Sequence, residues 1–121
     1  MDFFHCPLII ISRNKGRSAV AASAYISASR LENTWDGTTH DYTRKRHVIY
    51  TEVMLPAHAP PEYADRSVLW NSVEWNEKKR DAQLARTLEL ALPAELTHDQ
   101  NIALIRKFVQ ETFVEKGMCA D

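Results

Sequence analysis

The sequence of 121 residues has little cysteine, no long apolar run and no excess of charge of either sign. Its two cysteines, Cys6 and Cys119, lie far apart and lack metal-site spacing, which gives no sign of a disulfide scaffold and suits a reducing cytoplasm. The apolar run at residues 6–11 is too short to cross a bilayer and has no basic leader, so we expect neither a membrane span nor a signal peptide. Without repeats or low-complexity linkers, the chain is one domain or part of one.

The charged residues are balanced in number but not in position. Fifteen Lys and Arg residues stand against sixteen Asp and Glu residues, so the formal net charge is −1 at pH 7. The first half carries two basic triplets, Arg13, Lys15 and Arg17, and Arg44, Lys45 and Arg46, while acidic residues concentrate in the second half. A polyanion would therefore meet the first half of the chain. The alternative is that these are ordinary solvated charges.

The most informative segment is residues 13–25, where a basic loop leads into a helix of small residues. Ser18 has the properties of an N-cap, and we predict a helix from about Ser18 to Leu31. Tyr25 shares one face of this helix with alanines, so its phenol would project from a rigid surface. This pattern suits a tyrosine nucleophile brought to a nucleic-acid backbone. The alternative is a tyrosine that covers a hydrophobic core beside the alanines.

Three apolar runs predict β-strands. The β-branched run Leu8–Ser12 is typical of a central strand that is covered on both faces. Residues 47–55 alternate and stop at a proline, which predicts a second strand. In the third run, residues 84–92, leucines mostly alternate with smaller or polar residues. Glu89 then lies in mid-strand on the face opposite the leucines, where a carboxylate either faces water or is held for a purpose.

The segments between these strands predict a polar loop and a second helix. Residues 32–46 form the loop, in which an Asp-Gly pair favours a hairpin turn. A Pro-Pro pair at residues 60–61 introduces the helix, which has acidic residues in its first turn. Its buried stripe includes Trp75, and we interpret Trp70 and Trp75 as structural aromatic residues.

The last third of the chain predicts a third helix and the start of another strand. Thr97 and Gln100 form a capping box that begins the helix, and Gly117 ends it. Residues 118–121 then have the pattern of a strand. Taken in order, these elements predict an α+β fold, with helices packed on a sheet and a strand-helix-strand-helix-strand-helix order.

Several separated motifs carry a resemblance to a known family. They are residues 10–25, His40-Asp41-Tyr42-Thr43-Arg44-Lys45, Leu55-Pro56 with Pro60-Pro61-Glu62, residues 81–86, residues 91–96 and Gly117-Met118-Cys119-Ala120-Asp121. In this order they make the chain similar to the N-terminal part of MobA/MobL-type relaxases, a group that includes the TraA conjugal transfer proteins. The resemblance covers essentially all of residues 1–121. It implies the N-terminal part of a relaxase domain of the HUH type, truncated before its end.

The resemblance implies a metal-dependent DNA strand transferase that starts plasmid conjugation or mobilisation. Family members nick one strand at an origin of transfer, keep the 5′ end as a phosphotyrosine and later rejoin it. Tyr25 falls on the family's nucleophile, and Glu89 falls on a strand carboxylate near the metal, whereas Thr87 stands where some members carry a second acid. The implied partners are single-stranded origin-of-transfer DNA, which the two basic triplets would contact, and other relaxosome proteins.

The divalent metal that the resemblance implies finds no ligands in this sequence. The family's histidine triad includes a pair on a strand beyond Asp121, and the five histidines of this chain show no such pairing. We therefore expect the chain alone to be catalytically inactive, because no cation would polarise the scissile phosphate. Two alternatives stay open: a remnant that binds single-stranded DNA without chemistry, and a nonfunctional fragment or interaction module.

Overall fold

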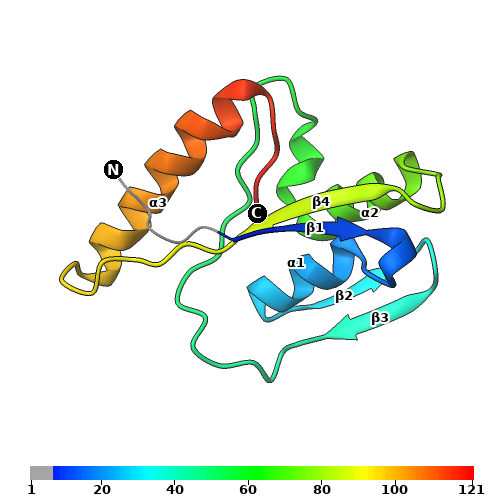
Figure 1. Cartoon of the computed structure of the whole chain (residues 1–121), viewed down its shortest axis with the longest axis horizontal. Helices are drawn as coiled ribbons and strands as arrows, with labels where there is room; N and C mark the ends of the chain where they lie inside the picture. Colours follow the sequence, from blue (N-terminus) through cyan, green and yellow to red (C-terminus); the bar gives the residue numbers. More distant parts are fainter. Residues whose placement is uncertain (1–6) are drawn as a thin grey trace.

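The computed structural model describes residues 7–121, so the expectations for His5 and Cys6 lie outside the described residues. The elements in chain order are β1 (Leu8–Ser12), η1 (Arg13–Lys15), α1 (Ala19–Ser27), β2 (Arg30–Asn33), β3 (Thr38–Asp41), η2 (Pro61–Ala64), α2 (Arg66–Asn76), β4 (Gln83–Leu88), α3 (His98–Thr112) and η3 (Val114–Lys116). The η elements are 3-10 helices (Figure 1). This arrangement confirms the α+β class.

The first strand pairs with the fourth in an antiparallel ladder. Leu8 lies opposite Leu88, and the register shifts between Ile11 and Ser12. The predicted bounds of β1 are confirmed, but its central position is wrong within the described chain, where β1 pairs with β4 alone. Only Ile11 of this strand is buried, because only the end of β1 reaches the core below α2.

A hairpin formed by β2 and β3 replaces the end of the predicted helix and part of the predicted loop. Helix α1 ends at Ser27 because Ala28 takes a left-handed conformation with φ of 52°, and Leu31 lies in β2. The two strands pair antiparallel from Arg30 opposite Asp41 to Asn33 opposite Thr38. The Asp-Gly turn was predicted correctly, and the helix bound at Leu31 was wrong.

The predicted strand at residues 47–55 is absent from the described chain. His47 takes a left-handed conformation with φ of 69°, which interrupts an extended backbone at the expected start. Only Met54 pairs, in an isolated antiparallel bridge to Ala120. This bridge is also all that the described residues form of the strand predicted at residues 118–121. A strand needs a continuous partner, and this segment has a partner at one residue.

Helix α2 begins later than predicted. The Pro-Pro pair opens the 3-10 helix η2, and α2 starts after Asp65, whose carboxylate accepts a hydrogen bond of 2.9 Å from the Ser67 N–H. Its buried side chains are Leu69 and Glu74, while Trp75 is 49% exposed. The predicted place of Trp75 in the buried stripe is therefore wrong. Glu74 is buried instead, because its carboxylate accepts a hydrogen bond from the start of α1.

The hydrophobic core lies where α1 and α2 pack against β1 and β4 (Figure 1). Its buried cluster consists of Ile11, Ala19, Ala82 and Leu84, with Ala22, Trp70, Val73 and Ala85 packed against it. Small side chains on α1, among them Ala19 and Ala22, face this core, and α1 packs closely on α2. The core therefore holds α1 rigidly, and α1 carries Tyr25.

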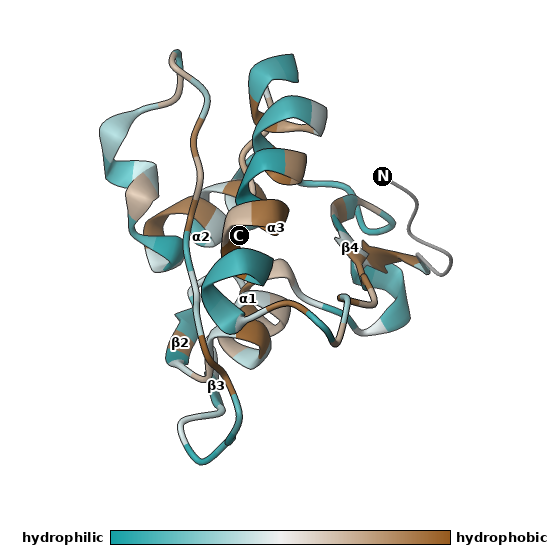
Figure 2. Ribbon diagram, turned by 90° about the vertical axis from the view of Figure 1, so that its left-hand side faces the viewer, coloured by the Kyte–Doolittle hydropathy of each residue, from teal (hydrophilic) through white to brown (hydrophobic). Residues whose placement is uncertain are grey.

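Helix α3 is attached more loosely. Its capping box is confirmed, because Thr97 accepts from the Gln100 N–H and Gln100 accepts from the Thr97 N–H, at 3.2 and 2.9 Å. Hydrophobic and hydrophilic residues alternate along it, yet none of its residues is buried (Figure 2). It ends at Thr112, so the predicted stop at Gly117 is wrong for α3; Gly117, with φ of 95°, ends η3 instead. No helix within residues 7–121 has the length and apolarity to cross a membrane.

Candidate functional site

Tyr25 lies on the last full turn of α1 and is 52% exposed. The helix that carries it is fixed at its start by Ser18, whose hydroxyl accepts a hydrogen bond of 3.1 Å from the Ala21 N–H. At its other end the Ala28 N–H is hydrogen-bonded to the carbonyls of Ala24 and Tyr25. The phenol is thus solvent-accessible while its backbone is held on a packed helix, as the sequence predicts.

Two side chains from beyond β3 contact the ring of Tyr25. The Lys45 ammonium lies 3.6 Å from the ring centroid and donates a hydrogen bond of 2.9 Å to the Tyr25 carbonyl oxygen. Tyr42 packs edge-on, with centroids 5.3 Å apart and ring planes at 89°. A cation over a ring face and a T-shaped ring pair are both attractive arrangements. Lys45 also lies at the C-terminal end of α1, where the helix dipole favours positive charge.

The backbone that presents Tyr42 and Lys45 is held by its own hydrogen bonds. The Tyr42 N–H donates to the Ser29 carbonyl at 3.0 Å, and the Lys45 N–H donates to the Tyr42 carbonyl at 2.9 Å. Just before Tyr42, the Asp41 carboxylate accepts from the hydroxyl and the N–H of Thr43 at 2.6 and 2.9 Å. These two hydrogen bonds lower the pKa of Asp41, and the bond from the Thr43 hydroxyl has the larger effect. Residues 41–45 therefore form an ordered turn beside Tyr25.

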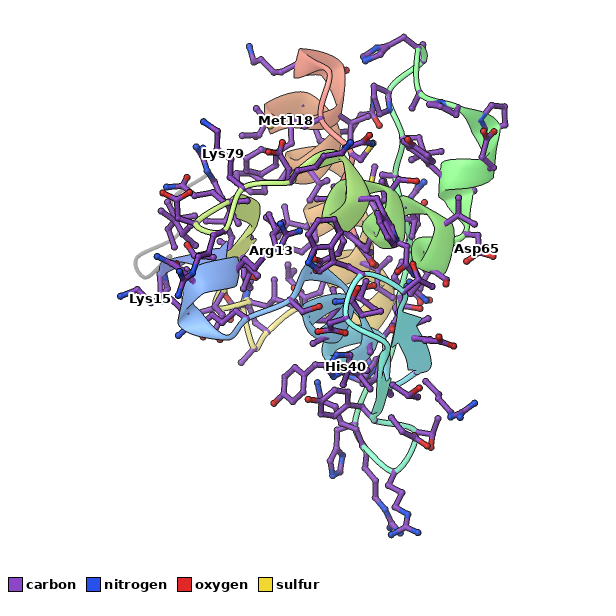
Figure 3. All side chains as sticks on the ribbon, turned by 90° about the vertical axis from the view of Figure 1, so that its right-hand side faces the viewer. Arg13, Lys15, His40, Asp65, Lys79 and Met118 are labelled. Carbon is purple, nitrogen blue, oxygen red and sulfur yellow. The ribbon has the colours of Figure 1, made fainter. Side chains whose placement is uncertain are left out.

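Arg13, at the opposite end of α1, has its guanidinium committed inside the protein. It donates to the Glu74 carboxylate at 3.2 Å and to the carbonyls of Glu74 and Lys79 at 2.6 and 3.0 Å. It also lies 4.2 Å from the centroid of a Trp35 ring, which packs edge-on against Trp75. Figure 3 shows Arg13 turned inward while Lys15 and Lys79 lie at the edge. These contacts give Arg13 a structural role.

The N-terminus of α1 is occupied by the protein's own carboxylate. Glu74 is 1% exposed, and its second carboxylate oxygen accepts a hydrogen bond of 2.9 Å from the Ala19 N–H. The Asn33 side chain, also buried, donates to the Ser18 hydroxyl at 3.1 Å. The Ala19 N–H at the start of α1 is therefore not free to bind a phosphate, because Glu74 already accepts from that donor.

The other predicted DNA-binding cations are exposed. Lys15 and Arg17 lie before α1, and Arg44 and Arg46 lie beyond its other end. A helix of nine residues is about 13 Å long, so the structure places the two basic triplets at opposite ends of α1 rather than in one cluster. Each triplet turns its remaining member inward: Arg13 to Glu74, and Lys45 to Tyr25.

Glu89 does not lie within a strand. Strand β4 ends at Leu88, and the next N–H, that of Glu89, donates to the Pro7 carbonyl at 3.2 Å. The side chain is exposed, and no hydrogen bond within residues 7–121 joins it to Tyr25. The mid-strand position is wrong because β1, the partner of β4, begins at Leu8 opposite Leu88, so no residue of β1 lies opposite Glu89.

Asp121 is a buried carboxylate that the sequence analysis did not single out. Its side chain is 3% exposed and accepts from the Ser23 hydroxyl at 2.5 Å and from the Trp70 indole N–H at 2.9 Å. Arg66 pairs with it at 3.1 Å. These contacts join the end of the described chain to α1 and α2, and they confirm Trp70 as structural. The available signal was a carboxylate at the end of an otherwise apolar run.

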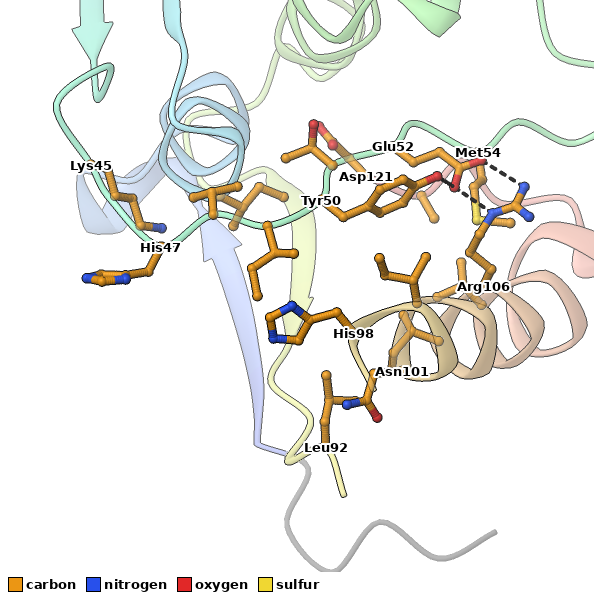
Figure 4. Close-up of a pocket in the computed structure, with 18 residues that line it drawn as sticks. Lys45, His47, Tyr50, Glu52, Met54, Leu92, His98, Asn101, Arg106 and Asp121 are labelled. Atoms are coloured by element: carbon orange, nitrogen blue, oxygen red, sulfur yellow. Dashed lines mark hydrogen bonds and ion pairs between the residues drawn. The ribbon is translucent and has the colours of Figure 1, made fainter. Parts of the chain in front are cut away.

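A cavity of about 560 Å³ lies between residues 45–54 and α3. Its walls are mostly apolar, and a cluster of three polar side chains closes one end (Figure 4). There Arg106 donates to both oxygens of Glu52 at 2.7 and 2.9 Å, and the Tyr50 hydroxyl donates to Glu52 at 2.6 Å. The hydrogen bonds from Arg106 lower the pKa of Glu52, and the bond from Tyr50 lowers it further by a smaller amount. The same bond to Glu52 raises the pKa of Tyr50. This cluster ties α3 to the segment before the Met54 bridge.

No group of three or more His, Cys, Asp or Glu side chains within residues 7–121 is arranged to hold a metal ion. His47 and His98 line the cavity together with Glu52 and Asp121, but no three of these side chains are arranged to hold an ion. The residues that the structure describes therefore do not fit a metal centre by themselves.

Comparison with known proteins gives one consistent result. A model of the MobA/MobL family matches residues 17–121. The conjugal transfer protein TraA of Rhizobium radiobacter is 46% identical over an alignment of 131 residues that includes all of this chain. The mobilization protein MobL of Acidithiobacillus ferridurans is 39% identical over all of the chain. The probable mobilization protein MobA of Bifidobacterium longum (strain NCC 2705) is 35% identical over 99% of it.

A solved structure described as "Molecular Basis of Vancomycin Resistance Transfer in Staphylococcus aureus" has the same fold. It superposes with a TM-score of 0.85 at 34% identity, over 91% of this chain and 56% of that one. The chain spans 12% of the TraA protein, 31% of the MobL protein and 21% of the MobA protein. These relatives are therefore much longer than this chain, and the comparison covers only part of each of them.

Proposed function

Because the chain belongs to the MobA/MobL family, we propose that it is the tyrosine-bearing part of a relaxase that mobilises plasmid DNA. The observation that carries the proposal is the placement of Tyr25, a half-exposed phenol on a rigid helix beside a cation. In the longer protein, Tyr25 would join the 5′ end of a nicked strand at an origin of transfer. The names of the relatives, which are conjugal transfer and mobilisation proteins, support this direction.

The proposed reaction is a phosphoryl transfer in which one phosphodiester replaces another. The Tyr25 phenolic oxygen attacks the scissile phosphorus, the bond to the 3′ oxygen breaks, and the phenolic proton leaves to a base or water as the 3′ hydroxyl forms. The new phosphotyrosine keeps the energy of the broken bond, so a later attack by a 3′ hydroxyl rejoins the strand. A rigidly held nucleophile lowers the entropic cost of this step.

The exposed cations at both ends of α1 would bind the DNA strand. Lys15 and Arg17 lie before the helix, and Arg44 and Arg46 lie beyond it, so a strand that contacts both pairs passes along α1 and Tyr25. Phosphate contacts of this kind position a nucleic acid without reading its sequence. The Arg13 guanidinium is excluded from this surface by its bonds to Glu74.

The divalent metal and the role of Glu89 belong to the same proposal. By the family resemblance, the histidine ligands of the metal would come from a segment that follows the matched region. A metal held there would stabilise charge on the scissile phosphate. Glu89 is exposed at the open end of β4, so its carboxylate is available to a segment that packs there in a longer protein. We retain it as the carboxylate near the metal.

The experiment is a covalent-adduct assay with two forms of the protein. The chain is tested alone and fused at Asp121 to the segment that follows the matched region in the Rhizobium radiobacter TraA relative. Each is mixed with labelled single-stranded origin DNA and a divalent metal, and adducts are separated on a denaturing gel. We expect no adduct from the chain alone and a clear adduct from the extended chain.

Matched tyrosine variants identify the nucleophile. Tyr25→Phe should abolish the adduct and leave DNA affinity largely intact, because the hydroxyl matters for bond formation more than for binding. Tyr42→Phe, which removes the neighbouring hydroxyl and keeps the ring, should retain it. An extended chain that binds DNA but forms no adduct would favour the DNA-binding remnant over the enzyme. An adduct that persists in Tyr25→Phe would assign the attack to another residue.

A further inference from the structure

The ammonium group of Lys45 has an unusual set of neighbours. It lies 3.6 Å from the Tyr25 ring centroid and bonds to the Tyr25 carbonyl, yet no carboxylate within residues 7–121 lies within ion-pair distance of it. The side chain is half-buried, although lysines usually extend into water. Both of its contacts are with the one residue that carries the proposed chemistry.

We propose that Lys45 is a positioning residue for Tyr25, acting together with Tyr42. This inference rests on the proposed function, because it assigns a role relative to the Tyr25 nucleophile. The Lys45 ammonium covers one face of the Tyr25 ring, and the Tyr25 and Tyr42 rings pack edge to face. Together they hold the phenol in one orientation above the end of α1.

An exposed tyrosine needs such contacts to keep one orientation. Tyr25 is 52% exposed, so core packing does not select its rotamer, and staggered side-chain rotamers exchange readily on a surface. Nucleophilic attack requires the phenolic oxygen to stay within a narrow range of the phosphorus, and small misplacements are costly. Lys45 and Tyr42 supply the restraint that burial does not.

The turn that carries these two residues is built to hold them in place. Tyr42 is tied to the end of α1 through the Ser29 carbonyl, and Asp41 closes the turn on Thr43. The Lys45 N–H bonds to the Tyr42 carbonyl, so the two contacts to Tyr25 have a fixed separation. No carboxylate within residues 7–121 lies within ion-pair distance of this ammonium, so the Tyr25 ring and carbonyl are the partners that hold it beside the phenol.

The first test is nuclear magnetic resonance on the full 121-residue chain with ring-labelled tyrosine. The Tyr25 signals are assigned by their loss in Tyr25→Phe. Lys45→Met keeps the length of the side chain and removes the charge, so we expect the Tyr25 ring signals to shift and sharpen as the ring gains rotamers. Lys45→Arg should restore them, because a guanidinium also lies over aromatic rings. Arg46→Met, the adjacent cation, should leave them unchanged.

The second test measures the rate of adduct formation in the extended chain at saturating DNA. Lys45→Met should lower that rate by about tenfold or more, since a misplaced reacting group costs up to about a hundredfold. It should change DNA affinity less, and Lys45→Arg should recover most of the rate. Lys107→Met, a charge change on the outer side of α3, is the control that should leave the rate unchanged.

The outcomes separate this inference from the proposed function. If the extended wild-type chain forms no adduct, the proposed function fails, and the ring signals alone decide whether Lys45 restrains Tyr25. Ring signals that are the same in Lys45→Met as in the wild type overturn the inference. It is also overturned if the signals shift but the rate at saturating DNA does not, because Lys45 would then be a structural contact only.

Discussion

The two ends of helix α1 carry similar clusters with different partners. At the N-terminal end, Arg13 lies over Trp35, which packs edge-on against Trp75. At the C-terminal end, Lys45 lies over Tyr25, which packs edge-on against Tyr42. Each cluster is one cation on a T-shaped pair of aromatic rings, and each cation comes from one of the two basic triplets.

The difference between the clusters is the presence of a carboxylate. Arg13 pairs with Glu74, which is almost fully buried and also bonds to the start of α1. Within the described residues, the Lys45 ammonium contacts the carbonyl and the ring of Tyr25, and Tyr25 is half-exposed. A cation that is neutralised inside the protein stabilises the fold, whereas one without a carboxylate beside an exposed phenol is available for chemistry. The N-terminal end of α1 is therefore a structural cluster, and the C-terminal end is the one to which the proposal assigns the chemistry of Tyr25.

The strongest way to break the structural cluster is to remove the Glu74 carboxylate. Glu74→Ala would leave the Arg13 guanidinium partly buried without its ion-pair partner and the Ala19 N–H without its acceptor. Breaking such a buried pair costs about 3–5 kcal/mol, so we expect a large fall in the urea midpoint, to the point of unfolding. Equilibrium unfolding followed by circular dichroism measures it.

Two further variants make this result interpretable. Glu74→Gln retains an acceptor for Ala19 and removes the charge, so its loss of stability should be smaller than that of Glu74→Ala. Lys45→Met should cost only about 0.5–1 kcal/mol, the size of an exposed cation–π contact. If Glu74→Ala and Lys45→Met are equally mild, the distinction between the two clusters is lost.

The exposed cations at both ends of α1 provide the next comparison. Replacing Lys15 and Arg17 together with alanine should reduce the slope of log affinity against log salt for single-stranded DNA by about 1.4, at roughly 0.7 per phosphate contact. Replacing Arg44 and Arg46 should have the same effect if the strand spans α1. Fluorescence anisotropy over a salt series gives both slopes. An unchanged slope for one pair would remove that end from the DNA path.

The smallest expected effect is at the exposed ion pair of Arg106 with Glu52, which contrasts with the buried pair of Arg13 with Glu74. The lowered pKa of Glu52 means that its contribution to stability is complete above the ordinary value of 4.5 and is lost as the pH falls through the lowered value. Glu52→Gln should therefore reduce stability slightly at pH 7 and not at all at strongly acidic pH. Urea midpoints at several pH values test this, and an equal difference at every pH would contradict it.

Local patterns predicted the elements that local interactions form. The N-cap Ser18, the Asp-Gly turn and the Thr97 capping box all depend on residues within a few positions, and all are confirmed. The strand Leu8–Ser12 is also confirmed, because the distant strand β4 supplies its partner. The predicted strand at residues 47–55 is wrong because alternation does not supply a pairing partner. Strand formation depends on residues far away in the sequence, so periodicity alone could not decide it.

The candidate site was predictable where one residue stands out and not where residues combine. Tyr25 was visible as a large hydroxyl among small residues, and its exposure on α1 agrees with that interpretation. The burial of Glu74 and Asp121 was not visible, because their partners Arg13 and Arg66 lie 61 and 55 positions away. The inward turn of Arg13 follows from its contact with Glu74, and that of Lys45 from its contact with Tyr25, 20 positions away, so these two members of the basic triplets looked like surface charges.

The most direct measurement of the central claim is to locate the DNA on the protein. Trypsin places Tyr25 in the peptide of residues 18–30 and Tyr42 in the peptide of residues 31–44, so each is the single tyrosine of its peptide. Mass spectrometry of the digested adduct from the extended chain should find the added 5′-phosphonucleotide only on the peptide of residues 18–30. A nucleotide found on residues 31–44, or on any other peptide, would contradict the assignment of Tyr25 as the nucleophile.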